Sequence, residues 1–390
     1  MFNIILLGIT SLLTDISSEM VYPLIPLFLT SIGAGPAALG LIEGIAESLA
    51  SLLKVFSGYI ADRIGKKKAL TIAGYSFSAT GKVMLALASG WGTVLAARSA
   101  DRFGKGIRTA PRDALIAGSA SKEKRGRAFG LHRGMDTAGA VIGVGAAYLL
   151  VAGGSRDYAR VFLLSVIPAL AGVAFLFWLR EPARTAAANP VRPVLAWRIL
   201  PENLRRFLAV ALVFSLGNSS NAFLLLRASG TGHAPGDVLL YYLVYNISYM
   251  LLSYPAGRLS DRLGRKPVLV GGYTVYACVY VGFALFDPAQ SPALAWILFA
   301  LYGVYSGLTD GIEKALVADL APQEIRGTAI GVHAMITGIG LFPASLVAGL
   351  LWSAWGPAAP FLLGGALGLV AACGIALFVR SGTSSSLPAL

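Results

Sequence analysis

Four carboxylates lie in stretches of the sequence that are otherwise apolar. Asp15 and Glu19 are four residues apart, and Glu43 and Glu47 repeat that spacing further along the chain. Residues four apart share one face of a helix, and a charge at the centre of a bilayer costs about 2.5–3.5 kcal/mol on insertion scales. Crowded carboxylates in a low dielectric also exchange protons closer to neutral pH than carboxylates in water. We therefore predict that at least one of the four carries a proton.

A mostly basic cluster occupies residues 93–119. At about 100° per residue, its charged side chains fall within an arc of about 140°, and they are Arg98, Asp101, Arg102, Lys105, Arg108, Arg112 and Asp113. Such a face must point into the protein rather than at lipid. The guanidinium group binds carboxylate or phosphate through two parallel hydrogen bonds. The substrate-binding candidates of this region, for an anionic group, are therefore Lys82, Arg98, Arg102, Arg108 and Arg112.

The same charges also balance one another, which leaves a structural interpretation open. Seven acids match seven bases: Asp15, Glu19, Glu43, Glu47, Asp101, Asp113 and Asp136 against Lys82, Arg98, Arg102, Lys105, Arg108, Arg112 and Arg133. A network of internal salt bridges that holds the helices together would use these residues too. The further proton-coupling candidates are Asp113, Asp136 and His132, which precedes Asp136 by one helical turn.

The second part of the chain carries a thinner polar set. Its substrate-binding candidates are Asn218, Asn221, Tyr245, Asn246, Tyr249, Asp310, Glu313 and Lys314. The tyrosine spacing fits helix packing, or the wall of the mostly apolar cavity that an organic ligand needs. If the charges served only to pack the helices, we would expect them in both halves. Their concentration in the first half therefore favours proton handling there.

The composition predicts that these residues are positioned by membrane-spanning helices. Of 390 residues, 56% are hydrophobic and 13% are charged, against about 25% charged in a typical soluble domain. The net charge of +13 is better explained by basic cytoplasmic loops than by nucleic acid. Both cysteines, Cys278 and Cys373, lie in apolar runs, so neither a disulfide framework nor a cysteine metal site is expected.

Twelve stretches are long and apolar enough to span a bilayer, which takes about 20 residues. They are 4–30, 37–57, 69–89, 93–119, 128–152, 158–179, 207–227, 237–257, 268–286, 293–318, 328–352 and 359–379. Lys and Arg gather in the loops on one side, so both termini are predicted to be cytoplasmic. The charged stretch 93–119 could instead be a loop. Only five crossings would then separate the basic loops at 63–68 and 258–266, which would place these loops on opposite sides of the membrane. We therefore predict that it is a span buried within the protein.

Two motifs recur at a half-chain offset. The run Gly58–Lys67, with Asp62, Arg63, Gly65 and Lys66, returns 199 residues later as Gly257–Lys266, with Asp261, Arg262, Gly264 and Arg265. The run Arg125–His132 returns as Arg326–His333. Such repeats predict two parallel six-helix halves. We expect the halves at 1–180 and 207–380, a cytoplasmic linker at 181–206 and a disordered tail at 381–390.

The repeated motif resembles the signature loop of major facilitator superfamily transporters, as do the chain length and the twelve spans. The resemblance implies an all-α fold of two pseudo-symmetric six-helix halves. It also implies that the first copy of the loop, with Asp62, latches the cytoplasmic side while the protein faces outward. Arg98 matches the arginine that many proton-coupled members carry. Gly139, Gly143 and Gly145 match only part of the antiporter motif of the fifth span, because its proline is missing. The longer signatures, Thr14–Met20 and Gly104–Asp113, look like a bacterial subgroup.

These observations predict a secondary active transporter in the bacterial inner membrane, without a cofactor or metal and monomeric. It would move a small organic solute, anionic or zwitterionic, by proton-coupled alternating access. Proton-driven export of lipophilic cations or drugs, or of a metal ion, is an alternative, and a non-transporting membrane sensor is another. No enzyme is expected, because the sequence lacks a nucleophile–base pair, a zinc-site spacing and a phosphate-binding loop.

Overall fold

The computed structural model describes residues 2–64, 66–119, 125–152, 156–181, 200–230, 234–287, 292–322 and 325–380. The first half comprises α1 (Phe2–Val21), the short 3-10 helix η1 (Tyr22–Leu24), α2 (Ile25–Ser31), α3 (Pro36–Ile64), α4 (Lys67–Ala86), α5 (Trp91–Gly118), α6 (Arg125–Val151) and α7 (Tyr158–Leu176). The second comprises α8 (Glu202–Gly217), α9 (Ala222–Ala228), α10 (Pro235–Leu263), α11 (Arg265–Leu285), α12 (Pro292–Leu320), α13 (Arg326–Trp355) and α14 (Ala359–Phe378).

The twelve predicted spans are confirmed, with α1 to α2 and α8 to α9 each forming one crossing. In the described ranges, nine of the crossings are long and apolar enough to be recognised by composition alone. The other three are α4, α5 and α10. Residues 91–118 form one uninterrupted helix that packs against α3 and α4. The prediction that this charged stretch is a span within the protein is therefore confirmed.

The first span of each half is broken, which the sequence interpretation did not anticipate. Pro23 lies in η1 and Pro26 in the first turn of α2, and proline removes a backbone donor from the helix. The second break, residues 218–221, has no proline. There the freed backbone groups are satisfied from neighbouring helices, because Ser345 accepts from the Ser220 N–H at 3.1 Å and Tyr276 donates to the Gly217 carbonyl at 2.8 Å.

The ends of each half are closed by the same pair of hydrogen bonds. The Asn3 side chain binds the backbone N–H and carbonyl of Arg180 at 3.1 and 2.8 Å. Asn203 binds Arg380 in the same way, at 2.9 Å for both bonds. The asparagine side chain carries both a donor NH₂ group and an acceptor oxygen, so it can bond the backbone N–H and the backbone carbonyl of one residue. This equivalence extends the internal repeat to the first and last helix of each half.

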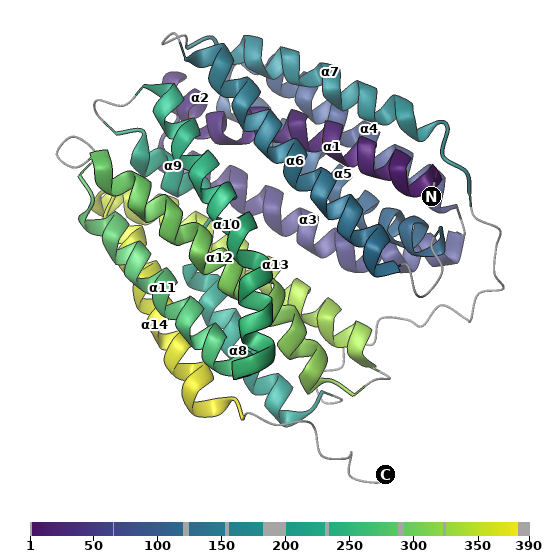
Figure 1. Cartoon of the computed structure of the whole chain (residues 1–390). Helices are drawn as coiled ribbons and strands as arrows, with labels where there is room; N and C mark the ends of the chain where they lie inside the picture. Colours follow the sequence, from purple (N-terminus) through teal and green to yellow (C-terminus); the bar gives the residue numbers. More distant parts are fainter. Residues whose placement is uncertain are drawn as a thin grey trace.

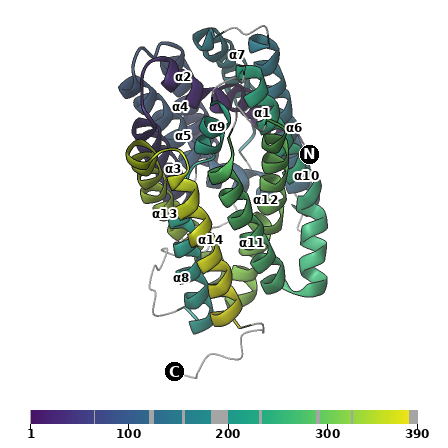
Figure 2. The same ribbon diagram turned by 90° about the vertical axis from the view of Figure 1, so that its left-hand side faces the viewer.

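The two halves form two bundles that meet at one end and diverge at the other (Figure 1). Both views place α2 beside α9, which are in contact (Figure 2). Along α3 and α13 the contact is close, because small residues face backbone: Gly349 lies against Pro36, and Ser48 donates to the Gly338 carbonyl at 2.6 Å. The end of the first bundle at which α1 begins and the end of the second at which α14 ends lie apart (Figure 1). The halves are therefore joined away from the predicted cytoplasmic side.

Candidate functional site

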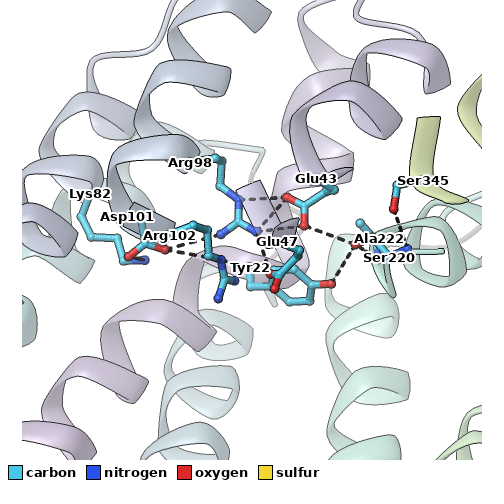
Figure 3. A network of polar contacts seen from close by, with 10 residues as sticks. All are labelled: Tyr22, Glu43, Glu47, Lys82, Arg98, Asp101, Arg102, Ser220, Ala222 and Ser345. Carbon is cyan, nitrogen blue, oxygen red and sulfur yellow. Dashed lines mark hydrogen bonds and ion pairs between the residues drawn. The ribbon is translucent and has the colours of Figure 1, made fainter. Parts of the chain in front are cut away.

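A chain of ion pairs crosses the centre of the first half (Figure 3). Lys82 lies 3.3 Å from Asp101, and Asp101 lies 3.6 Å from Arg98. The Arg98 guanidinium then binds Glu43 in a bidentate manner, with both hydrogen bonds at 2.9 Å. Arg98 is 2% exposed and Glu43 is fully buried. Breaking such a buried pair leaves an uncompensated charge, so this arrangement fixes α3, α4 and α5 relative to one another.

Glu47 belongs to the same cluster but is less enclosed. It pairs with Arg102 at 3.1 Å, and its side chain is 27% exposed. Three acids and three bases therefore meet here: Glu43, Glu47 and Asp101 with Lys82, Arg98 and Arg102. Since each cation has a carboxylate partner, this part of the basic face is a salt-bridge network in this conformation. The structural interpretation holds for these six residues.

Glu43 also connects the two halves (Figure 3). Its carboxylate accepts a hydrogen bond from the Ser220 hydroxyl at 3.2 Å, and Ser220 lies at the break between α8 and α9. The Tyr22 hydroxyl lies 3.3 Å from the same Ser220 oxygen. The Tyr22 ring is also 5.4 Å from the Arg98 guanidinium carbon. The ion-pair chain of the first half therefore ends on a backbone break of the second half.

Asp15 and Glu19 lie apart from that chain, on the face of α1 that packs against α6. A Cβ atom added to Gly139 would lie 3.1 Å from the Asp15 Cβ, and one added to Gly143 would lie 3.1 Å from the Glu19 Cβ. The two glycines thus make room for the two acids. Neither acid has an ion-pair partner within 4 Å among the described residues, and one Glu19 carboxylate oxygen is buried without a hydrogen-bond partner there.

The remaining charges of α5 and α6 are only partly paired. Arg112 pairs with the adjacent Asp113 at 2.9 Å. Arg108 is buried over the Tyr75 ring at 4.2 Å and donates to the Ser78 hydroxyl at 2.5 Å, without an acid within 4 Å in the described ranges. His132 is buried and lies 3.7 Å from Asp136. The predicted network of seven acids and seven bases is therefore realised only in part.

A cavity of about 420 Å³ lies between the halves. Seven of the predicted substrate-binding residues line it: Asn218, Asn221, Tyr245, Tyr249, Asp310, Glu313 and Lys314. Tyrosine rings form part of the wall, with the Tyr302 ring centroid 5.2 Å from those of Tyr245 and Tyr305. The lining continues to Ile330, near the start of α13. The cavity thus extends from the break after α8 towards the predicted cytoplasmic side.

The other predicted substrate-binding residues do not line this cavity in the described part of the structure. They are Lys82, Arg98, Arg102, Arg108, Arg112 and Asn246. Asn246 instead donates to the Tyr242 carbonyl of its own helix at 2.9 Å. The arginines of α5 are engaged by acids or by Ser78, as described above. The sequence could not reveal this, because the residues that share a face of one helix need not face one cavity.

Most charges on the cavity wall are already paired. Lys314 lies 3.2 Å from Asp310, which also accepts from the Tyr249 hydroxyl at 2.7 Å. Glu313 lies 3.3 Å from His333. Lys54 also lines the cavity and has no acid within 4 Å among the described residues, and the acid that acts most strongly on its charge is Glu47. The sequence interpretation missed Lys54, although it lies seven residues after Glu47 and so on the same face of α3.

The repeated loop motif is described only in part. Gly58, Asp62, Arg63 and Gly65 lie outside the residues whose side chains the structure describes, as do most of the linker 181–206 and the tail 381–390. The Lys67 and Lys68 N–H groups donate to Glu181 at 2.8 and 3.2 Å, at the start of α4, and Lys66 is exposed. In the second copy, Arg265 binds Asp261, Ser260 and Asp319. Gly257, Arg262 and Lys266 flank the contacts of Arg265 in the sequence. Gly264 has φ +90°, a conformation that favours glycine.

Comparison with known proteins relates the chain to one family of membrane transporters. The Major Facilitator Superfamily profile matches residues 7–342 and 207–389. An uncharacterised MFS-type transporter of Methanocaldococcus jannaschii is 37% identical over 374 residues, which cover 94% of this chain and 92% of that protein. The multidrug resistance protein MdtH of Edwardsiella ictaluri is 26% identical, over 85% of this chain and 82% of that protein. The crystal structure of the nucleoside transporter NupG matches with a TM-score of 0.82 at 14% identity, over 97% of this chain and all of that one.

Proposed function

The chain belongs to the major facilitator superfamily, and we propose that it is a secondary active transporter that couples protons to the movement of a small organic solute. The solute is anionic or zwitterionic and enters the cavity between the halves. The observation that carries this proposal is the separation of two polar sites: unpaired acids on α1, and a tyrosine-lined cavity with one unpaired cation. A transporter that couples two species needs a place for each.

Asp15 and Glu19 are the proposed proton carriers. They are the acids of the first half that lack a basic partner in the described structure, whereas Glu43, Glu47 and Asp101 are neutralised by bases. Keeping an unpaired carboxylate charged in a low dielectric costs free energy, and protonation removes that cost. Glu19 also borders the second half, because it lies beside Tyr242 on α10. A change of its charge therefore acts at a boundary between the halves.

Alternating access follows from the arrangement of the halves. The cavity extends towards the predicted cytoplasmic side, and the contacts of α2 with α9 and of α3 with α13 close the other side. We propose that a rocking motion of the halves closes the cytoplasmic side and opens the opposite side. The first copy of the loop motif, through Asp62, then holds the cytoplasmic side closed in the opposite state. We propose that the protein acts as a monomer in the inner membrane, with both termini in the cytoplasm.

Export of lipophilic cations or drugs is a second candidate, supported by the tyrosine wall of the cavity and by the similarity to MdtH. Aromatic faces attract cations as well as flat neutral rings, and the wall also carries Asp310 and Glu313. Both acids already have partners, at 3.2 and 3.3 Å. A cationic solute would have to displace Lys314 or the His333 contact, whereas an anion at Lys54 has no ion pair within 4 Å to displace in the described structure.

Flux in proteoliposomes tests the proposal. We expect solute movement driven by an imposed pH gradient, which Asp15→Asn or Glu19→Gln abolishes while the protein still folds. Glu47→Gln is the matched control, because the Glu47 side chain is 27% exposed and paired with Arg102, and the variant should retain pH-driven flux. Normal coupling in both α1 variants would refute their role. Inhibition by lipophilic cations alone, and not by carboxylates, would favour the second candidate.

A further inference from the structure

Lys54 is placed where the two halves begin to separate. One turn earlier on α3, Ser51 still packs against α13, since a Cβ added to Gly338 would overlap the Ser51 side chain. Ser51 and Lys54 are the residues that the first half contributes to the described cavity lining. Every other described lining residue belongs to the second half. The ammonium group of Lys54 is thus the charge that the first half presents to the cavity.

Asn218 lines the same cavity from the second half and carries an acceptor without a partner in the described structure. The Asn218 amide donates to the Tyr305 hydroxyl at 3.4 Å, but its carbonyl oxygen is buried and has no hydrogen-bond partner among the described residues. A buried acceptor without a partner costs about 1–3 kcal/mol. An N–H group of a bound solute would satisfy it. Asn218 and Lys54 therefore offer complementary positions for a donor and for an anion.

Flat rings line the space between these groups. Tyr245 and Tyr249 stack with ring planes 7° apart, and Tyr302 lies between Tyr245 and Tyr305 at 5.2 Å from each. Aromatic walls favour planar ligands through offset or edge-to-face contacts. The cavity of about 420 Å³ is also within the range of sites that hold drug-sized molecules.

We propose that the solute is an aromatic carboxylate that carries an N–H donor, with its carboxylate on Lys54 and its N–H on Asn218. Such a molecule touches both halves at once. A ligand shifts a conformational equilibrium only by its differential affinity for the two states, and a ligand that bridges Lys54 and Asn218 binds best when their spacing fits. The assignment rests on the proposed transport function, because it names the solute of that same cavity.

Binding to the full chain in nanodiscs tests the assignment, measured by isothermal titration calorimetry with three probes. The probes are 4-aminobenzoate, benzoate, which lacks the N–H, and aniline, which lacks the carboxylate. We expect 4-aminobenzoate to bind more tightly than benzoate, and benzoate more tightly than aniline. Lys54→Gln should weaken both carboxylates about tenfold or more and leave aniline unchanged. Lys54→Arg should retain binding, and Asn218→Leu should remove the preference for 4-aminobenzoate over benzoate.

Lys314→Gln is the matched control, because this lysine lines the same cavity but is paired with Asp310. It should change carboxylate affinity less than threefold. Equal binding of aniline and the carboxylates, no effect of Lys54→Gln, or no carboxylate binding at millimolar concentration would overturn the assignment. Binding is measured without a pH gradient, so the outcomes remain distinct. Selective binding without pH-driven flux would refute the coupled transport and leave the site intact.

Discussion

The hydroxyl of Ser220 is the point at which one small substitution should shift the balance between the two states of the transporter. It donates to Glu43 at 3.2 Å and lies 3.3 Å from the Tyr22 hydroxyl, and both partners belong to the other half. Both contacts join one half to the other, so we expect them to be lost when the halves separate on this side. Ser220→Ala removes them without changing the charge of Glu43, which remains held by Arg98 at 2.9 Å.

The expected magnitude follows from the kind of bond that is lost. A hydrogen bond to a charged group contributes about 1.5–3 kcal/mol, and a neutral one about 0.5–1.5 kcal/mol. In the opposite state water replaces both, so we expect Ser220→Ala to disfavour the present state by about 2 kcal/mol. This corresponds to about 30-fold in the equilibrium between the states. Tyr22→Phe removes only the neutral bond and should shift the equilibrium by a smaller factor.

Cysteine labelling measures this shift. Cys278 and Cys373 are exposed and must first be replaced by serine. A cysteine is then introduced at Leu39, which is 1% exposed near the closed end, or at Thr337, which lines the cavity. Ser220→Ala should raise the maleimide labelling rate at position 39 by up to about 30-fold. It should lower the rate at position 337 if the opposite state becomes dominant.

Ser165→Ala is the control for this experiment, because Ser165 is fully buried and its hydrogen bond in the described structure stays within its own helix, to the Phe162 carbonyl at 2.7 Å. Its labelling rates should match those of the parent. If Ser220→Ala leaves the position-39 rate within twofold of the parent, the contact does not stabilise the closed side. An equal rise in Ser165→Ala would show general loosening instead.

Three further tests of the packing inferred above use thermal unfolding in detergent. Arg98→Met leaves the buried Glu43 without its ion-pair partner, so we expect a loss of about 3–5 kcal/mol; unchanged stability would contradict the ion-pair chain. Gly139→Ala places a Cβ 2.5 Å from a backbone carbonyl of α1 and should cost about 1–3 kcal/mol, whereas Gly145→Ala, with nothing within 4 Å, should be tolerated. Asn3→Ala and Asn203→Ala each lose the two backbone hydrogen bonds of the closure, and Asn3 also loses a bond to the Ser119 hydroxyl at 3.1 Å. Each should cost about 1–3 kcal/mol; a cost near zero for either would argue against that closure.

The sequence alone determined the number of spans and their approximate bounds. The reason is that a bilayer imposes a length of about 20 apolar residues on each crossing, which composition reveals without any knowledge of packing. The charged stretch 93–119 was recovered by the parity of the basic loops, because an even number of crossings must separate loops on the same side. The repeats likewise fixed the two-half architecture, since duplicated motifs keep their spacing.

The breaks within the first span of each half are marked in the sequence but stabilised by tertiary structure. Pro23 and Pro26 mark the first break, and the run Gly-Asn-Ser-Ser-Asn at 217–221 is a turn signal for the second. The sequence interpretation passed over both signals. What the sequence does not show is that Ser345 and Tyr276, on other helices, satisfy the freed backbone groups.

The division of labour among the charges was also decided by tertiary structure. Helical spacing placed Glu43 and Glu47 on one face, as it did Asp15 and Glu19, and treated the two pairs alike. Only the fold brings arginines of α5 to the first pair and the glycines of α6 to the second. Lys54 was overlooked for the same reason: whether a lysine near a span end meets an acid, lipid headgroups or a cavity depends on the helix that packs beside it. The pairing of charges depends on neighbours distant in sequence, and a single helix cannot specify them.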